Sequence, residues 1–309
     1  FCEYTKIEVL KMKTTQNLKF RSSFLWIVLI LSAISYQSAM AVTFMDGFET
    51  GDLSRTGGVS PSGFKWSGMS KNPIVVNGFA KDGKSSLRFR FSGSAPGGQA
   101  WSEERYKLGG NYNNVWLKAD IFIPKNYYCR GSDHNKGPFF LWSGNYGVAT
   151  AHVGANFEHW CVNGNAYLTF NPGGEGVNHG HFATCLDSDC APKGIPNGTP
   201  YSRGVPFVDR SKDLNKWHEW IIHLRPATTS TSNDGIVEVW KDGVKVWYRY
   251  DLYYHSDTNN YFDQGYIMGY SNSGFDQQTD IYYDNFVFST ERINSNVKAP
   301  LAPAPLLVQ

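Results

Sequence analysis

The chain has 309 residues, of which 16% are aromatic and 18% charged, and it contains 31 glycines and 14 prolines. This composition is too aromatic and too rich in turn-forming residues for a helical protein, and the length suits one large all-β domain. The formal charge is only +2, and no basic run follows the first 41 residues. Nucleic acid is therefore not an expected partner.

Residues 12–41 have the pattern of a secretory signal: basic residues, then an apolar run over 24–34, then Ala39-Met40-Ala41. The apolar run is too short for a comfortable membrane span. Without residues 1–41, which hold five bases and two acids, the 29 basic and 27 acidic residues fall to 24 and 25. We expect a secreted or periplasmic mature protein, a monomer without membrane association. Residues 1–11 precede a plausible start methionine.

Short strand-like runs separated by Gly, Pro, Asn and Asp follow from residue 42 onward. They predict an antiparallel β-sandwich or jelly roll over 42–292, and a Pro- and Ala-rich tail over 293–309. A hairpin is expected where Asp242-Gly243 separates two alternating runs. The predicted strands cover residues 86–92, 99–108, 115–123, 138–142, 166–170, 217–224, 235–240, 244–250, 265–270 and 280–289.

Four cysteines remain after the predicted cleavage, an even number that suggests two disulfides. Three pairings are open, and we favour Cys185–Cys190 together with Cys129–Cys161. Residues 171–213 have little periodicity and are interpreted as a long disulfide-braced loop, which is usually functional. Zinc is the alternative, with His179 and His181 nearby, although the spacing fits no standard zinc pattern.

The segment Trp101-Ser102-Glu103-Glu104-Arg105 is the first candidate for site chemistry. On a strand, Trp101, Glu103 and Arg105 share one face. A guanidinium fixed by a neighbouring carboxylate can bind a substrate carboxylate through two parallel hydrogen bonds. A surface ion pair of little consequence is the alternative.

Two histidines and a lysine form the second candidate. His134 and Lys136 come just before a predicted strand. An imidazole there can serve as a general base, and the nearby ammonium group can neutralise a negative charge. His152 lies in a mixed segment and is a further candidate base. A polar loop is the alternative interpretation.

The segment 265–290 supplies the third candidate. Tyr266 and Tyr270 share a strand face and Asn272 follows, so rings for sugar stacking, a phenol for proton transfer and an amide for a carboxylate come together. The alternative is that tyrosines simply favour strands. Trp142, at the end of another strand, is a further candidate for stacking.

A cluster of acids at both ends of the domain predicts a structural calcium ion. Hard oxygen ligands from the two ends could close the sandwich, and turn chemistry by Asp and Gly is the alternative. The candidate ligands are Asp46, Glu49, Asp52 and Asp284. A Glu-x-Asp-x-x-Glu run is absent, which disfavours hydrolysis by carboxylates on one strand, although carboxylates from separate strands stay open.

Five segments together resemble secreted polysaccharide-lyase-like proteins of the concanavalin-A-like jelly-roll group, which includes heparin lyase I, glucuronan lyase and alginate lyases. The resemblance spans most of 42–293, and Ser102, Glu103 and Arg105 match a strand motif of the alginate lyases, with Trp101 where that motif begins with Arg. The segments are FMDGFETGDLS, SLRFRFSG, WSEERYKLGG, NDGIVEVWKDGVKVW and IYYDNFVFSTERI.

The resemblance implies a lyase that cleaves a uronic-acid-containing polysaccharide by β-elimination. Arg105, helped by Asn272 or Lys136, would neutralise the carboxylate, and Tyr270 or His152 would take the C5 proton. Trp101, Trp142 and Tyr266 would stack on sugars. A lectin-like carbohydrate-binding protein and a glycoside hydrolase on the same fold are the alternatives.

Overall fold

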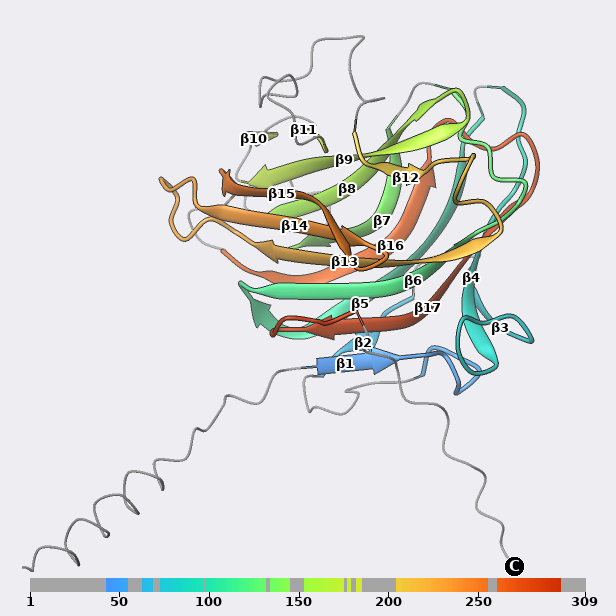
Figure 1. Ribbon diagram of the computed structural model, residues 1–309. Coiled ribbons are helices and arrows are strands. Elements are labelled where there is room, and N and C mark those ends of the chain that lie inside the picture. The colour runs from blue at the N-terminus through green and yellow to red at the C-terminus, as the bar shows by residue number, and fades with distance from the viewer. Residues whose placement is uncertain are drawn as a thin grey trace, which may run out of the picture. The chain divides into compact units, whose positions relative to one another are not determined.

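The computed structural model describes residues 43–54, 63–68, 73–96, 98–131, 134–144, 153–174, 177–178, 182–184, 204–254 and 260–295. All regular structure in these ranges is β-strand, arranged as two antiparallel sheets (Figure 1). The predicted antiparallel β-sandwich is confirmed. A search of the same residues finds no helix with the length and apolar character needed to cross a membrane.

Sheet A has the strand order β15-β14-β13-β6-β17-β4-β3, and β1 pairs with β17 outside this path. Its central neighbours β13, β6 and β17 come from distant parts of the chain, as a jelly roll requires. The bounds are β1 Thr43–Asp46, β3 Ile74–Asn77, β4 Ser85–Phe91, β6 Val115–Ile123, β13 Lys216–Arg225, β14 Gly235–Lys241, β15 Val244–Leu252 and β17 Thr279–Ser289.

Sheet B has the order β10-β9-β8-β7-β16-β5-β2, and β11 and β12 also pair with β9. It carries most of the residues singled out from the sequence. The bounds are β2 Lys65–Trp66, β5 Ala100–Tyr112, β7 His134–Trp142, β8 Gly154–Val162, β9 Asn165–Gly174, β10 Val177–Asn178, β11 Phe182–Ala183, β12 Pro206–Val208 and β16 Phe262–Ser271.

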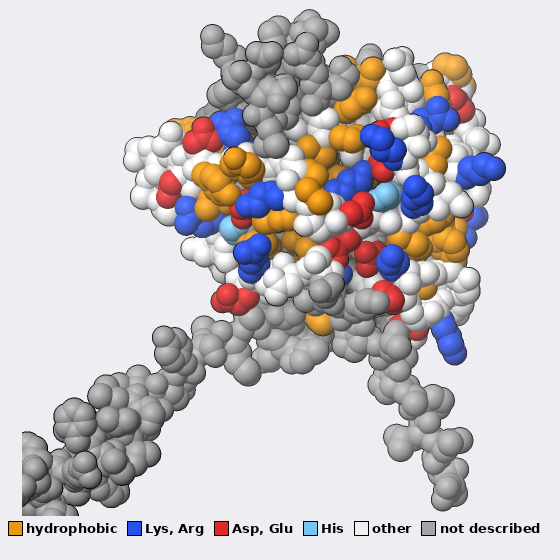
Figure 2. Space-filling view, in the orientation of Figure 1, with side chains coloured by type: hydrophobic (Ala, Val, Ile, Leu, Met, Phe, Trp, Pro, Cys, Tyr) orange, Lys and Arg blue, Asp and Glu red, His pale blue; other side chains and the backbone are white. Residues whose placement is uncertain are grey.

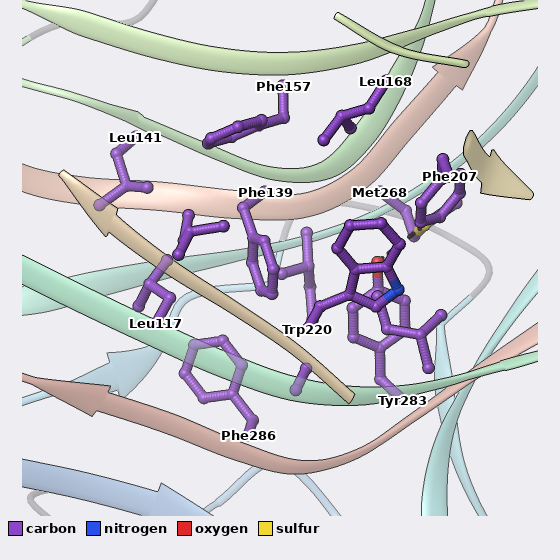
Figure 3. Close-up of a cluster of buried hydrophobic side chains, with 14 of the residues drawn as sticks. Leu117, Phe139, Leu141, Phe157, Leu168, Phe207, Trp220, Met268, Tyr283 and Phe286 are labelled. Atoms are coloured by element: carbon purple, nitrogen blue, oxygen red, sulfur yellow. Dashed lines mark hydrogen bonds between the residues drawn. The ribbon is translucent and has the colours of Figure 1, made fainter. Parts of the chain in front are cut away.

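The core lies between the two sheets and consists of the alternate, inward-facing side chains of each strand. Figure 3 shows Leu117 and Phe286 from sheet A meeting Phe139 and Phe157 from sheet B. Trp220, the largest of these side chains, is fully buried. The opposite face of each sheet, called its outer face below, is therefore free to carry polar and functional groups.

Two predicted local features are confirmed. The β14–β15 hairpin turns at Asp242 and Gly243, which have φ values of 51° and 80°, as an Asp-Gly turn of type I′ requires. Cys129 and Cys161 form a disulfide with Cα atoms 5.3 Å apart. Cys185, Cys190, His179 and His181 lie outside the described residues.

The predicted loop over 171–213 is partly wrong. Residues 171–174 continue β9, and residues 206–208 form β12, which pairs with β9. Glycine and proline in these stretches hid the strand pattern. Phe207 and Val208 are fully buried, so tertiary packing outweighs the weak local preference.

Candidate functional site

The outer face of sheet B gathers the first and third candidate groups on two adjacent strands. On β5, Trp101, Glu103 and Arg105 point outward, as their alternation predicts. In the β5–β16 pairing, Tyr266 lies opposite Arg105 and Tyr270 lies opposite Trp101. Directly opposite residues of an antiparallel pair share a face. The guanidinium and both phenols therefore belong to one surface.

Arg105 is held in place by Glu103. Its Nε donates to Glu103 Oε1 at 2.6 Å, and Trp101 Nε1 donates to Glu103 Oε2 at 3.2 Å. The guanidinium carbon also lies 5.9 Å from the centre of the Trp142 ring, within reach of a cation–π attraction. Because Glu103 is only 2% exposed, this charge-assisted contact orients the guanidinium rigidly.

The aromatic residues of this face divide into an open pair and a buried group. Trp101 and Tyr270 stack with ring centres 5.3 Å apart and planes 7° from parallel, and Tyr270 is 41% exposed. Tyr266 and Trp142 are 1% and 3% exposed, and the ring centres of Phe140 and Tyr266 lie 4.8 Å apart. The open pair offers a sugar-stacking surface, and the buried rings form the wall behind it.

Lys136 extends the site onto β7 and β8. Its ammonium group pairs with Glu158, whose Oε1 also accepts a hydrogen bond from Asn156 Nδ2 at 2.6 Å. The stem of Lys136 packs against Gly269, and Tyr266 lies against the same glycine. Lys136 and Tyr266 are thereby brought close together, with Arg105 opposite Tyr266 on the other side.

Three other predicted residues have different outcomes. Asn272 lies partly buried in the turn after β16. His134 is the first residue of β7, where it pairs with Trp160. His152 lies outside the described residues. The neighbouring amide Asn135, which the sequence did not single out, accepts hydrogen bonds from Ser271 Oγ and Ser273 N at 3.2 and 3.0 Å and so fixes the end of β16.

The four predicted calcium ligands each accept hydrogen bonds from protein donors. Asp46 accepts from Phe48 N and Trp66 Nε1, and Asp52 accepts from Ser54 N. Glu49 and Asp284 both brace the β3–β4 connection: Glu49 accepts from Lys84 N and Ser85 N, and Asp284 from Lys81 N and Asp82 N.

These four carboxylates are not part of any metal-like group among the described residues. The group found there is Cys129, His159 and Cys161, and its two cysteines form the disulfide. The calcium site stays a prediction.

Sequence reasoning missed two groups on this surface, Asn156 and Glu158, and placed Glu104 correctly on the opposite face of β5. Asn156 and Glu158 alternate in the sequence with the apolar Ala155 and Phe157 of β8, although all four are buried, and this polar–apolar alternation is the signal that could have found them. Glu104 points the opposite way from Glu103, into the sandwich, where burial raises its pKa to about 7. Gly68 N donates to its Oε1 at 3.0 Å.

Comparison with known proteins gives a clear result for the fold. No protein-family model matches the sequence, and no curated protein is significantly similar to it. Among solved structures, the endo-β-1,4-glucuronan lyase of the fungus Trichoderma reesei superposes with a TM-score of 0.50 at 16% identity, covering 73% of this chain and 91% of that one. The chain therefore shares the β-sandwich architecture of this lyase.

An alginate lyase gives similar values, with a TM-score of 0.51 at 12% identity over 82% of this chain and 98% of that one. A variant of that enzyme, solved with an alginate trisaccharide, has a TM-score of 0.50 at 12% identity, over 81% and 99% of the two chains. Identities this low establish a shared architecture. The predicted resemblance to jelly-roll polysaccharide lyases is confirmed at that level.

Proposed function

We propose that this protein is a polysaccharide lyase that cleaves a uronic-acid-containing polymer by β-elimination. The observation that carries the proposal is the placement of two cations and two phenols on one sheet face. Arg105 and Lys136 lie on either side of Tyr266, and Tyr270 lies four residues further along β16. Structures of a glucuronan lyase and an alginate lyase share the architecture.

The reaction needs three services from the protein. A cation must neutralise the sugar carboxylate, because this makes the neighbouring C5 proton more acidic. A base must take that proton, so that the C5–H electrons form the C4–C5 double bond as the C4–O bond breaks. An acid must protonate the departing oxygen.

Arg105 and Lys136 are the candidates for the first service, with Asn272 as a further hydrogen-bond donor. Glu103 and Glu158 hold the two cations in place. Tyr270, the more exposed phenol, is the candidate base, and His152 is the alternative. The second proton transfer falls to a tyrosine or histidine of the same face, and Trp101 with Tyr270 offers a stacking surface for the sugar.

A lectin-like protein is the second candidate function. The observation in its favour is that both cations are already paired with buried carboxylates, which reduces their attraction for a substrate carboxylate. An exposed Trp101–Tyr270 stack would still bind sugar rings without chemistry.

The deciding experiment incubates the purified protein with polyglucuronate and with alginate, and follows ultraviolet absorbance and reducing ends together. A lyase raises both, because each cut leaves a conjugated double bond and a new reducing end. Reducing ends without absorbance would indicate a hydrolase, and binding without either would indicate the lectin. The Cys129–Cys161 disulfide supports our proposal that the protein is secreted.

A further inference from the structure

A row of aromatic side chains crosses the outer face of sheet A, on the side of the sandwich away from the candidate site. Trp217 on β13 lies opposite Phe122 on β6, which lies opposite Tyr282 on β17. Phe79, from the connection between β3 and β4, packs on all three, with ring centres 5.8, 4.8 and 4.5 Å away.

These rings do not belong to the sandwich core, because they point away from it. Phe79 is 37% exposed. Figure 2 shows this face of sheet A, where hydrophobic side chains gather in separate areas with charged groups between them. Because Phe79 contacts the other three rings, the four form one apolar patch, and an exposed apolar patch with a polar rim commonly marks a binding site.

A cavity of about 300 Å³ opens beside the row, called the outer pocket below. Phe79, Phe122 and Tyr282 supply its apolar wall. The other lining residues are Pro124 and five polar ones, which come from the ends of β6 and β17 and the residue before β13: Lys125, Asn126, Asn215, Gln278 and Asp280. The size lies at the small end of ligand sites, about 300–1,000 Å³, and suits one sugar unit rather than a long groove.

The polar side of the outer pocket is ordered and nearly balanced in charge. Arg90 binds Asp280 through two hydrogen bonds of 2.9 and 2.7 Å, so that carboxylate is fixed and neutralised. Asn126 Nδ2 donates to the backbone oxygen of Gln278 at 2.8 Å, which joins the two segments. Lys125 is the remaining charge.

Apolar rings, amides and a fixed carboxylate in one pocket match a pyranose unit. Such a sugar packs its C–H face on aromatic rings and directs its hydroxyls to amide and carboxylate groups. Because Arg90 already neutralises Asp280 and the remaining charge, on Lys125, is exposed to solvent, a neutral sugar can bind here without an ion pair.

We infer that the outer pocket is a second saccharide site, which binds a neutral pyranose unit of a polysaccharide apart from the outer face of sheet B. The inference goes beyond the proposed function, since binding of a neutral polysaccharide at this pocket does not depend on cleavage of a uronate polymer at sheet B. In a secreted enzyme, such a site would raise the local concentration of chain segments near the protein.

The test is affinity electrophoresis of the full chain in gels that contain mixed-linkage β-glucan, glucomannan or xylan, with polyglucuronate and alginate gels as acidic probes. We expect at least one neutral polymer to retard the protein. Phe79→Ala should weaken the apparent affinity about tenfold, because one aromatic wall is lost. Gln278→Ala changes an exposed polar residue of the pocket and should weaken the apparent affinity in the same gel. This second variant keeps the test valid if Phe79→Ala lowers the stability of the protein.

Tyr248→Ala is the matched control, since Tyr248 is 44% exposed on β15 of the same sheet but does not line the outer pocket. It should migrate as wild type, and so should Tyr270→Ala on sheet B. The inference is overturned if no neutral polymer retards the protein, if Phe79→Ala and Gln278→Ala both bind as wild type, or if Tyr270→Ala abolishes the retardation. These binding outcomes do not depend on lyase activity, so a negative lyase assay would count against the proposed function and not against the outer pocket.

Discussion

The stem of Lys136 on β7 packs directly against Gly269 on β16, and no other residue type fits there. A Cβ atom at position 269 would lie 2.9 Å from Lys136 Cβ and 3.2 Å from Tyr266 Cε2, and the residue has a φ of +132°. The close approach of the two strands at this glycine brings the ammonium group and the Tyr266 phenol into one site.

Gly269→Ala should therefore destabilise the protein and displace Lys136. We expect a loss of about 3 kcal/mol in the free energy of unfolding, from backbone strain and the clash together, measured by urea denaturation. Gly51→Ala is the control: its φ is +83°, but no atom lies within 4 Å of a Cβ there, so only strain of about 1 kcal/mol remains. Equal losses in the two variants would contradict the packing argument.

Arg105→Lys tests the guanidinium while it keeps the charge next to Glu103. A lysine cannot present two parallel donors to a carboxylate, so we expect kcat/KM on polyglucuronate or alginate to fall at least about tenfold. Lys107→Arg makes the reverse change at an exposed position two residues along the same strand. That variant should retain wild-type activity, and a wild-type rate for Arg105→Lys would remove Arg105 from carboxylate binding.

Tyr270→Phe separates proton transfer from stacking. The phenylalanine ring keeps the parallel contact with Trp101 but has no hydroxyl to exchange a proton. If Tyr270 is the base, kcat should fall by about 10²–10⁴ with little change in KM. Tyr248→Phe on the other sheet is the control. An unchanged kcat would leave Tyr270 as a stacking residue and move the proton transfer to another group.

Reduction of the Cys129–Cys161 disulfide should lower stability without removing the fold. The bond closes a loop with a sequence separation of 32 residues, and a cross-link of this length contributes about 3–4 kcal/mol by restricting the unfolded chain. The Cys129→Ser/Cys161→Ser double variant should show this loss in urea denaturation under non-reducing conditions. A variant as stable as the wild type would show that the core alone holds these segments.

Strand alternation predicted much of sheet B's outer face before any coordinates. It placed Trp101, Glu103 and Arg105 together and opposed them to Glu104, because a period of two fixes which side chains share a face. It did not show that Tyr266 would be buried while Tyr270 stayed exposed. The exposure of each tyrosine depends on which strands lie beside β16. Packing between distant segments decides that arrangement, and no local sequence pattern predicts it.

The calcium site stays a prediction, and its candidate ligands illustrate a different limit. Acids close together in sequence read as possible ligands, but Asp46 and Glu49 accept backbone and indole donors from separate segments. A carboxylate of Asp or Glu can accept hydrogen bonds from backbone N–H groups as readily as it can bind a metal ion. β8 escaped prediction for another reason: Asn156 and Glu158 resemble loop residues in the sequence, whereas packing buries them together with Ala155 and Phe157.

Glu104 makes stability depend on pH near neutrality. Burial raises its pKa from 4.5 to about 7, so the folded protein holds a proton that the unfolded chain releases at lower pH. The stability is full below the unfolded value and declines as the pH rises through about 7, because the ionised carboxylate is then confined inside the sandwich. The loss should reach about 1–3 kcal/mol by pH 8.

Glu104→Gln should remove this dependence while its amide oxygen still accepts the hydrogen bond from Gly68 N. The measurement is the melting temperature of both proteins from about pH 5 to about pH 8, a range that spans the titration of the buried Glu104 carboxyl group. The wild type should lose more stability over this range than the variant, and the variant should be the more stable at the alkaline end. Glu291→Gln, at an exposed position, should follow the wild-type curve. Parallel curves for wild type and Glu104→Gln would show that Glu104 titrates alike in the folded and unfolded chains, and that the interior at β5 is open enough to water to hold its charge.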